Sequence, residues 1–267
     1  MAATISGKQQ YHTICTGKAL ETVQAHCQDA DIEMFGANFC PFVQRVWVTL
    51  EHKKIPYKYF ECDPYKKPKE LLDLNPKGLV PALKLPGGRS LGESTYLEEA
   101  FSPPNADQAL HPSLLPPLSD PYARAKARLE ADHVNRSIVP GFYRYLQAQG
   151  AEKQIEHGKE FMDELKKFTE KMHPEGPFFG GKELGWVDVM VGPWAFRSAN
   201  VLKHYRGFTA PVHGRYKIWA DAVFTHPAFI ATCSTEELYL DSYARYAENR
   251  PNTSQVANAI NSGRGLP

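Results

Sequence analysis

Residues 37–51, ANFCPFVQRVWVTLE, place a cysteine and a proline between a short apolar run and an amphipathic segment. The apolar residues of the amphipathic part recur at the spacing of one helical face: Val43, Val46, Trp47 and Leu50. Proline is favoured at the first helical position, where its missing N–H is not needed, so Cys40 is predicted near the helix N-cap. With IEMFG before it, the stretch predicts a strand, a cysteine-bearing turn and a helix.

The Cys40 sulfur is expected to face unpaired backbone N–H groups at the start of this helix. Those donors and the helix dipole favour anions, and thiols in such positions have pKa values lowered from about 8.5 to roughly 3.5–7.5. The alternative is a small buried residue that closes the turn. Strand, Cys-Pro and helix together favour the reactive thiol. Val43 stands where a dithiol oxidoreductase has its second cysteine, so a mixed disulfide on Cys40 would need an external thiol to resolve it.

From residue 31 to about 101, strand-like and helix-like patterns alternate in the order strand, helix, strand, helix, strand, strand, helix. This order predicts a compact α/β unit with a mixed sheet. Six prolines between 102 and 121 predict a linker, and beyond it the chain has long helical patterns. One of these helices is predicted to use the following core positions: Ile155, Met162, Leu165, Phe168 and Met172.

Composition limits the possible functions. A chain of 267 residues with 42% hydrophobic content can bury a large core, and we expect two domains. The formal net charge of +1 argues against nucleic acid as a partner, and no apolar run of about 18 residues could span a membrane. The start of the chain does not resemble a secretory signal, so we expect a cytoplasmic protein. Five cysteines without a Cys-x-x-Cys pair argue against a disulfide scaffold and a metal site.

Two further local patterns indicate backbone features of a binding site. Val80-Pro81 precedes a strand, where a proline in a tight turn is a candidate for a cis peptide bond. Ser94 or Thr95 is a candidate helix N-cap, and Thr95 with Glu98 forms a possible capping box. Here a simple helix cap and an anion-binding helix start are equally compatible with the residues.

Four motifs, in order, resemble the glutathione transferases, most closely the fungal omega-like enzymes. They are NFCPFVQRVWVTLEHKKIPY (38–57), YKKPKELLDLNPKGLVPAL (65–83), LGESTYLEEAF (91–101) and FFGGKELGWVDVMVGPWAFR (178–197). The resemblance implies an α/β thioredoxin-like N-terminal domain and an all-α C-terminal domain. The domain division is then an extension at 1–29, the thioredoxin-like domain at 30–102, a linker at 103–121, the helical domain at 122–250 and a tail at 251–267.

The resemblance also implies a site for glutathione as co-substrate, with no metal. Cys40 would be catalytic, and the residues implied for glutathione binding are Phe42, Lys67, Leu79, Val80, Pro81, Glu93 and Ser94. Main-chain groups of Val80 would pair with the cysteinyl part of glutathione. Ser94 would hold the γ-glutamyl carboxylate, Glu93 the ammonium group and Lys67 the glycyl carboxylate. Phe42 would form a wall of the thiol site.

Position matching places a second-substrate site on the helical domain. The residues implied there are Arg197, Tyr239 and Tyr246, and Tyr239 replaces a tryptophan typical of animal omega enzymes. Gly185 stands at the N-cap before Asp188, where serine or threonine is usual. Glycine at an N-cap costs only a few tenths of a kcal/mol relative to serine, so the fold should tolerate it.

The resulting prediction is a thiol transferase that removes glutathione from mixed disulfides or adducts, with weak conjugating activity. An alternative is a binding protein that sequesters apolar aromatic small molecules without turnover; 12% aromatic content is compatible with it. A catalytically silent relative is the third possibility. The relatives are commonly homodimers, and we expect a homodimer here.

Overall fold

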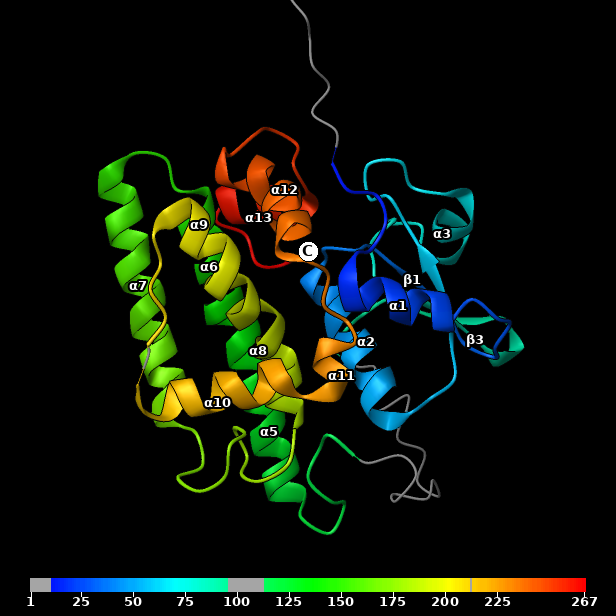
Figure 1. The fold of residues 1–267 in the computed structure, drawn as a ribbon, viewed down its shortest axis with the longest axis horizontal. Helices are drawn as coiled ribbons and strands as arrows, with labels where there is room; N and C mark the ends of the chain where they lie inside the picture. Colours follow the sequence, from blue (N-terminus) through cyan, green and yellow to red (C-terminus); the bar gives the residue numbers. More distant parts are fainter. Residues whose placement is uncertain (1–10, 96–112, 212) are drawn as a thin grey trace, which may run out of the picture.

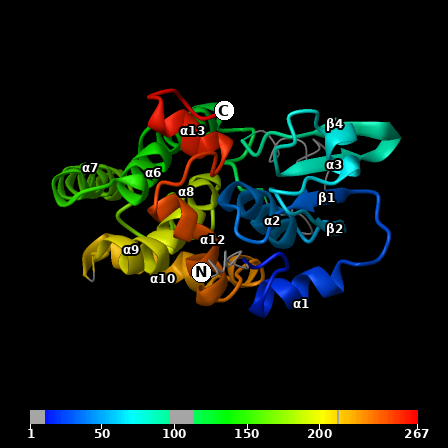
Figure 2. The ribbon, with the colours of Figure 1, turned by 90° about the horizontal axis from the view of Figure 1, so that it is seen from above.

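The computed structural model describes residues 11–95, 113–211 and 213–267. A small sheet with its helices lies beside a larger group of helices, and α2 lies between the two (Figures 1 and 2). The predicted thioredoxin-like domain and helical domain are therefore confirmed. The elements of the sheet domain are β1 (Glu33–Gly36), α2 (Pro41–Lys53), β2 (Lys58–Glu61), α3 (Lys69–Leu74), β3 (Ala82–Leu85) and β4 (Arg89–Leu91).

The sheet has the mixed topology that the order of patterns predicted. Its strand order is β2-β1-β3-β4. β1 pairs in parallel with β2 and antiparallel with β3, and β3 pairs antiparallel with β4. A single 3₁₀ turn, Pro86–Gly88, joins β3 to β4.

Helix α2 packs one apolar face on the sheet. Its predicted face residues are all nearly inaccessible to solvent: Val43, Val46, Trp47 and Leu50. Gly36 at the end of β1 makes this close packing possible, because a Cβ atom there would lie 2.6 Å from the Tyr59 hydroxyl oxygen and 2.7 Å from a Val43 methyl carbon. The turn between Gly36 and Pro41 contains Cys40, which therefore lies at the N-terminal end of α2.

The helical domain is built from long and short helices joined by π-helical turns. Its elements are α5 (Pro121–His133), η2 (Val134–Ile138), α6 (Val139–Gln147), α7 (Ala151–Glu170), α8 (Trp186–Arg197), η3 (Ser198–Leu202), α9 (Lys203–Arg206), α10 (Gly214–Thr225), α11 (Pro227–Ile230) and α12 (Glu236–Ala247). The predicted core face of α7 is right at Leu165 and Phe168, which are buried, and wrong at Ile155, which is 74% exposed. Phe161 is buried on this face instead and meets Phe142 of α6, whereas Ile155, six residues earlier, lies about 120° away around the helix.

Asp188 caps the helix that packs against α2. Its carboxylate accepts hydrogen bonds from the N–H of Gly185 (2.8 Å), the N–H of Phe179 (2.8 Å) and Nε1 of Trp219 (2.7 Å). Burial raises the pKa of Asp188 to about 6, and these three donors oppose the increase. The glycine at the N-cap is therefore tolerated because the aspartate three residues later supplies the cap.

Both ends of the described chain form structure that the sequence did not predict. Helix α1 (Gly17–Ala25) lies in the expected extension, and its Ala19 N–H donates to the carbonyl oxygen of Cys233 at 3.0 Å. The tail, expected at 251–267, contains α13 (Gln255–Asn261), which Ser254 caps. Figure 1 shows α13 lying beside α12, with the C-terminus returning toward α2.

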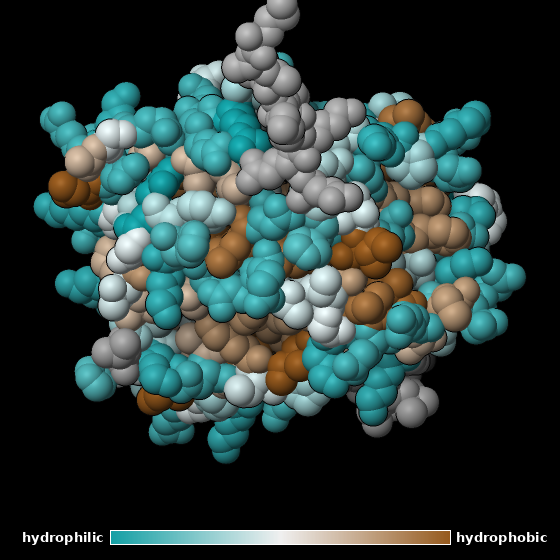
Figure 3. Space-filling view, turned by 45° about the horizontal axis from the view of Figure 1, so that its top comes forward, coloured by the Kyte–Doolittle hydropathy of each residue, from teal (hydrophilic) through white to brown (hydrophobic). Residues whose placement is uncertain are grey.

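Three predictions fall partly outside the described residues. The helix expected after Ser94 and the capping partner Glu98 lie outside them, as does most of the linker; residues 113–120 form neither helix nor strand. Within the described residues, no helix is long and apolar enough to cross a membrane. On the face shown in Figure 3, hydrophobic residues form separate groups among hydrophilic ones.

Candidate active site

A cavity of about 840 Å³ lies between the sheet domain and the helical domain. It brings together every residue predicted to bind glutathione or to react with it: Cys40, Phe42, Lys67, Leu79, Val80, Pro81, Glu93 and Ser94. These residues come from four separate segments of the chain, so the fold alone unites them. A volume of this size is within the range of sites that enclose a small molecule.

Cys40 is the N-cap residue of α2, as the sequence predicted. Its backbone is extended (φ −73°, ψ 120°), and Pro41 takes the first helical position. Its carbonyl oxygen accepts from the N–H of Gln44 at 3.1 Å. The residue is half-buried, and its sulfur lies 4.0 Å from the Val80 carbonyl oxygen.

The thiol of Cys40 has a raised pKa, which corrects the expectation of a lowered one. Burial is the largest influence and raises the pKa. The backbone N–H groups of Val43 and Phe42 lower it, as do the charges of Arg197 and Arg45. The predicted helix-start effect is thus present, but burial outweighs it. A sequence pattern shows the donors of a helix start and not the depth at which a side chain lies.

Val80 and Pro81 are joined by a cis peptide bond, as predicted. The bond directly precedes β3, so the main-chain groups of Val80 lie at the edge of the cavity opposite Cys40. Lys67 lies at the same edge, and its Nζ is 3.5 Å from the carbonyl oxygen of Lys77. This edge combines main-chain hydrogen-bonding groups with one positive side chain.

The glutamate–serine pair, Glu93 and Ser94, lies just beyond β4. Ser94 is buried, and the Thr95 hydroxyl is 3.4 Å from Oε1 of Glu93. Asn135 of η2 donates from Nδ2 to that hydroxyl at 3.4 Å, so a residue of the helical domain contributes to this corner. Sequence reasoning missed Asn135, because nothing in its local pattern separates it from an ordinary helical asparagine.

Arg45 is a buried cation in the cavity lining that sequence reasoning also missed. It is 1% exposed; its Nε donates to the Met190 carbonyl oxygen at 2.9 Å and its Nη2 to Oδ1 of Asn135 at 2.8 Å. Its guanidinium lies over the ring of Trp194 at 4.3 Å. Burial lowers its pKa to about 9, and the charge of Glu93 opposes that decrease. A negatively charged ligand group in the cavity would offset the unfavourable burial of this cation.

Of the three residues predicted for the second substrate, only Tyr246 lines the cavity. Arg197 is buried behind it, where Nη2 donates to the Phe39 carbonyl oxygen at 2.9 Å and Nη1 to Oε1 of Gln44 at 2.6 Å. Tyr239 is fully buried; its hydroxyl accepts from the N–H of Ser234 at 3.0 Å, and its ring stacks under Arg197. Arg197 links the two domains, Tyr239 packs against it, and the polar groups of both side chains are already satisfied.

The cavity lining also includes residues that the sequence did not indicate. Tyr65 comes from the loop after β2, and Tyr143 comes from α6. The tail adds a mostly polar wall: Asn252, Thr253, Ser254, Gln255, Val256, Asn258, Gly265, Leu266 and Pro267. Gln255 reaches across to the Lys77 carbonyl oxygen at 3.4 Å. Among the described residues no group of three potential metal ligands occurs.

Known proteins share this fold and parts of this sequence. A family model described as "Glutathione S-transferase, N-terminal domain" matches residues 39–102. The crystal structure of glutathione transferase Omega 3C from Trametes versicolor is 40% identical, with a TM-score of 0.78, and covers 88% of this chain and 98% of its own. A rice glutathione transferase in complex with glutathione is 27% identical, with a TM-score of 0.70, over 84% and 99%. Glutathione S-transferase omega-1 of Mus musculus is 25% identical over 84% of this chain and 89% of its own.

Proposed function

Because the chain belongs to the glutathione transferase family and to its omega class, we propose that it is a glutathione-dependent thiol transferase in which Cys40 is the single catalytic cysteine. The observation that carries this proposal is the position of Cys40. It starts α2 in the wall of the large cavity, and its sulfur lies near the Val80 main chain. No other cysteine among the described residues lines that cavity.

The reaction proceeds by two thiol–disulfide exchanges. The Cys40 thiolate attacks the glutathione sulfur of a mixed disulfide, the S–S bond to the acceptor breaks, and the acceptor leaves as a thiolate that takes up a proton. A second glutathione, as thiolate, attacks the Cys40–glutathione disulfide and forms glutathione disulfide, which regenerates the Cys40 thiolate. Val43 occupies the place of a resolving cysteine, so the second glutathione is required.

Glutathione binding follows from the charges around the cavity. The main chain of Val80 pairs with the cysteinyl part of glutathione and brings the substrate sulfur to Cys40. Lys67 attracts the glycyl carboxylate, Ser94 the γ-glutamyl carboxylate and Glu93 the ammonium group. Phe42, Leu79 and Pro81 supply apolar contact beside them. The contacts of Asn135 and Thr95 support this assignment, because they fix the corner in which Glu93 lies.

The acceptor binds beside the glutathione site, where Tyr246 and Phe42 offer aromatic surface to the cavity. Glutathionylated or apolar aromatic small molecules fit that surface, whereas Arg197 and Tyr239 act on the acceptor only through the structure they hold. Conjugation of glutathione to electrophiles should be weak, because a cysteine beside a bound thiol tends to form a disulfide with it.

A pair of variants tests the proposal. Glutathione-dependent reduction of a small glutathione mixed disulfide should be lost in Cys40→Ser, and Cys62→Ser serves as the control because Cys62 lies outside the cavity lining. Equal activity of wild type and Cys40→Ser would refute the mechanism. In that case displacement of a fluorescent apolar probe by aromatic compounds, without turnover, would favour the binding protein instead.

A homodimer is part of this proposal, supported by the outer face of α5. Two large apolar side chains of α5 are exposed, Tyr122 (77%) and Leu129 (65%), and so is Leu118 (68%) in the segment that precedes the helix. Tyr122 and Leu129 are seven residues apart and so share one helical face. Sedimentation should show twice the chain mass of 30.0 kDa, and Leu129→Glu should shift it to the single chain.

We expect the protein to act in the cytoplasm, where its five free thiols would stay reduced.

A further inference from the structure

A second cavity, of about 210 Å³, shares two wall residues with the large one, Phe39 and Tyr65. It lies where the N-terminal segment, the loops after β1 and β2, and α12 meet. Its lining residues are Tyr11, Phe39, Tyr65, Asp241, Ser242, Ala244, Arg245 and Arg250. Cys40 is absent from this lining, and the proposed thiol transfer gives the cavity no role.

Three of the lining residues carry buried polar atoms that make no hydrogen bond in the described part of the chain. These atoms are Oη of Tyr65, Oγ of Ser242 and Nε of Arg245. Ser242 is 4% exposed, so solvent does not compensate its hydroxyl. Buried polar groups are nearly always paired, and leaving a donor unpaired is unfavourable. All three groups can donate, so an acceptor would satisfy them.

Arg245 brings a positive charge to the same place. Its guanidinium lies over the Tyr65 ring at 4.0 Å, and within the described ranges it forms no ion pair with a carboxylate. The residue one helical turn earlier is Asp241, the usual partner at this spacing. The other arginine of the lining, Arg250, pairs with Glu248.

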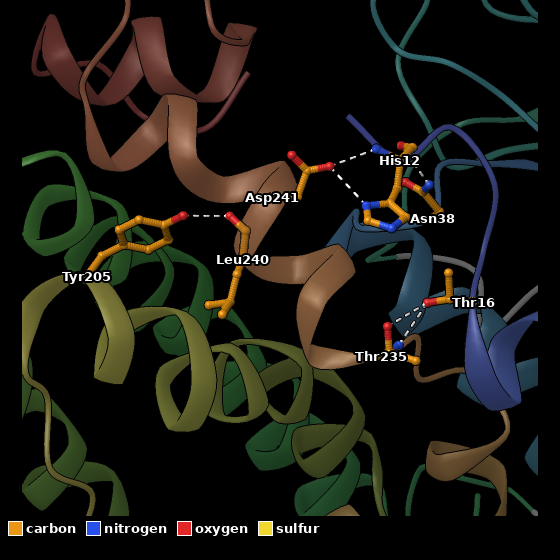
Figure 4. Close-up of polar contacts among 7 residues, drawn as sticks. All are labelled: His12, Thr16, Asn38, Tyr205, Thr235, Leu240 and Asp241. Carbon is orange, nitrogen blue, oxygen red and sulfur yellow. Dashed lines mark hydrogen bonds and ion pairs between the residues drawn. The ribbon is translucent and has the colours of Figure 1, made fainter. Parts of the chain in front are cut away.

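Asp241 forms no ion pair with Arg245, because its carboxylate is bound by His12 of the N-terminal segment. Its Oδ2 accepts from the His12 N–H at 2.8 Å and lies 2.9 Å from Nδ1 of the same histidine (Figure 4). Asn38 in turn donates from Nδ2 to the His12 carbonyl oxygen at 3.0 Å, which fixes His12 from the other side (Figure 4). The only carboxylate of the lining is therefore engaged, and the cavity keeps the net positive character of Arg245.

We propose that this second cavity binds a small oxyanion, either phosphate or the carboxylate of a small acid. Arg245 supplies the charge, and small rotations of Ser242 and Tyr65 direct their hydroxyl groups to the anion. Glutathione does not fit, because the volume is below the roughly 300–1,000 Å³ of sites that enclose drug-sized molecules. Since Tyr65 also lines the large cavity, the bound anion holds one wall of the Cys40 site in place.

Thermal unfolding of the full chain in increasing phosphate, with sodium chloride holding the ionic strength constant, tests this proposal. The melting temperature should rise and then saturate, because a ligand of the folded state stabilises it by mass action. Acetate in place of phosphate shows whether a carboxylate suffices. Arg245→Met should weaken the apparent phosphate affinity by at least about tenfold, the loss expected for a charged hydrogen bond.

Two further variants make the result specific to this cavity. Arg136→Met changes an arginine of the large cavity and should leave the stabilisation by phosphate intact. Ser242→Ala should reduce that stabilisation, and it tests the second cavity if Arg245→Met does not fold. The proposal is overturned if the melting temperature of the wild type shows no saturable rise with phosphate. It is also overturned if Arg245→Met or Ser242→Ala responds to phosphate as the wild type does, or if Arg136→Met loses the response. None of these results depends on Cys40, so they are separate from the test of thiol transfer.

Discussion

Replacing Arg197 with methionine should destabilise the fold and slow the reaction of Cys40 together. The sequence suggested a substrate contact for Arg197, but the structure makes it a buried link between α8 and the turn that carries Cys40. Its guanidinium donates to the Phe39 carbonyl oxygen and to Oε1 of Gln44. Methionine fills much of the volume but leaves both acceptors without this donor.

The expected loss of stability follows from those two acceptors. An unsatisfied buried acceptor costs about 1–3 kcal/mol, and removing the desolvated cation offsets part of the sum, so we expect about 3 kcal/mol. For a domain of this size, that corresponds to a fall in melting temperature of roughly 6–12 °C. The pKa of Cys40 should also increase, because the Arg197 charge lowers it in the wild type.

Two assays and one control separate these effects. Thermal unfolding gives the stability, and the alkylation rate of Cys40 at pH 8, measured well below the melting temperature, gives the thiolate fraction. Arg197→Lys keeps the charge and only part of the hydrogen bonding, so it should lose stability while retaining most of the alkylation rate. If Arg197→Met unfolds within 1 °C of wild type, or alkylates at the wild-type rate, the assigned role of Arg197 is wrong.

Three other substitutions test different parts of the structure. Burial raises the pKa of Glu61 to about 7. Between pH 4.5 and 7 the folded state therefore retains a proton that the unfolded state releases. The free energy of unfolding should fall by about 2–3 kcal/mol over this pH range. Urea unfolding of Glu61→Gln should lack that fall, and parallel pH profiles of the two proteins would refute the assignment. Asp188→Ala removes the acceptor of three buried donors, so its free energy of unfolding in the same assay should be about 3–5 kcal/mol lower. A decrease of less than about 1 kcal/mol would contradict the capping role of Asp188. Lys67→Ala should weaken glutathione binding about tenfold in calorimetry, and unchanged affinity would remove Lys67 from the site.

The sequence could predict the Cys40 end of the site because its signals are local. The helical spacing of Val43 and Trp47, and a proline at the first helical position, depend only on neighbouring residues. The Val80-Pro81 bond before β3 is a local feature in the same sense. Each of these predictions concerns a backbone position, and each is confirmed by the structure.

Predictions that depended on distant packing were less successful. An arginine in an apolar helix can face a cavity or a partner helix, and only the placement of α8 against α2 decides that Arg197 lies behind the wall. Arg45 was missed for the same reason, since its burial depends on Trp194 and Asn135. The tail was missed because its polar residues, such as Gln255, have no amphipathic pattern, and they become cavity wall only after α13 packs against α6.

Trapping the reaction intermediate tests the central claim most directly. The protein is mixed with a small glutathione mixed disulfide in the absence of free glutathione, and the intact chain and its peptides are then weighed by mass spectrometry. Thiol transfer predicts one glutathione per chain, attached to Cys40, which added glutathione removes. A chain that gains no glutathione, or gains it on another cysteine while Cys40 stays free, would contradict the account.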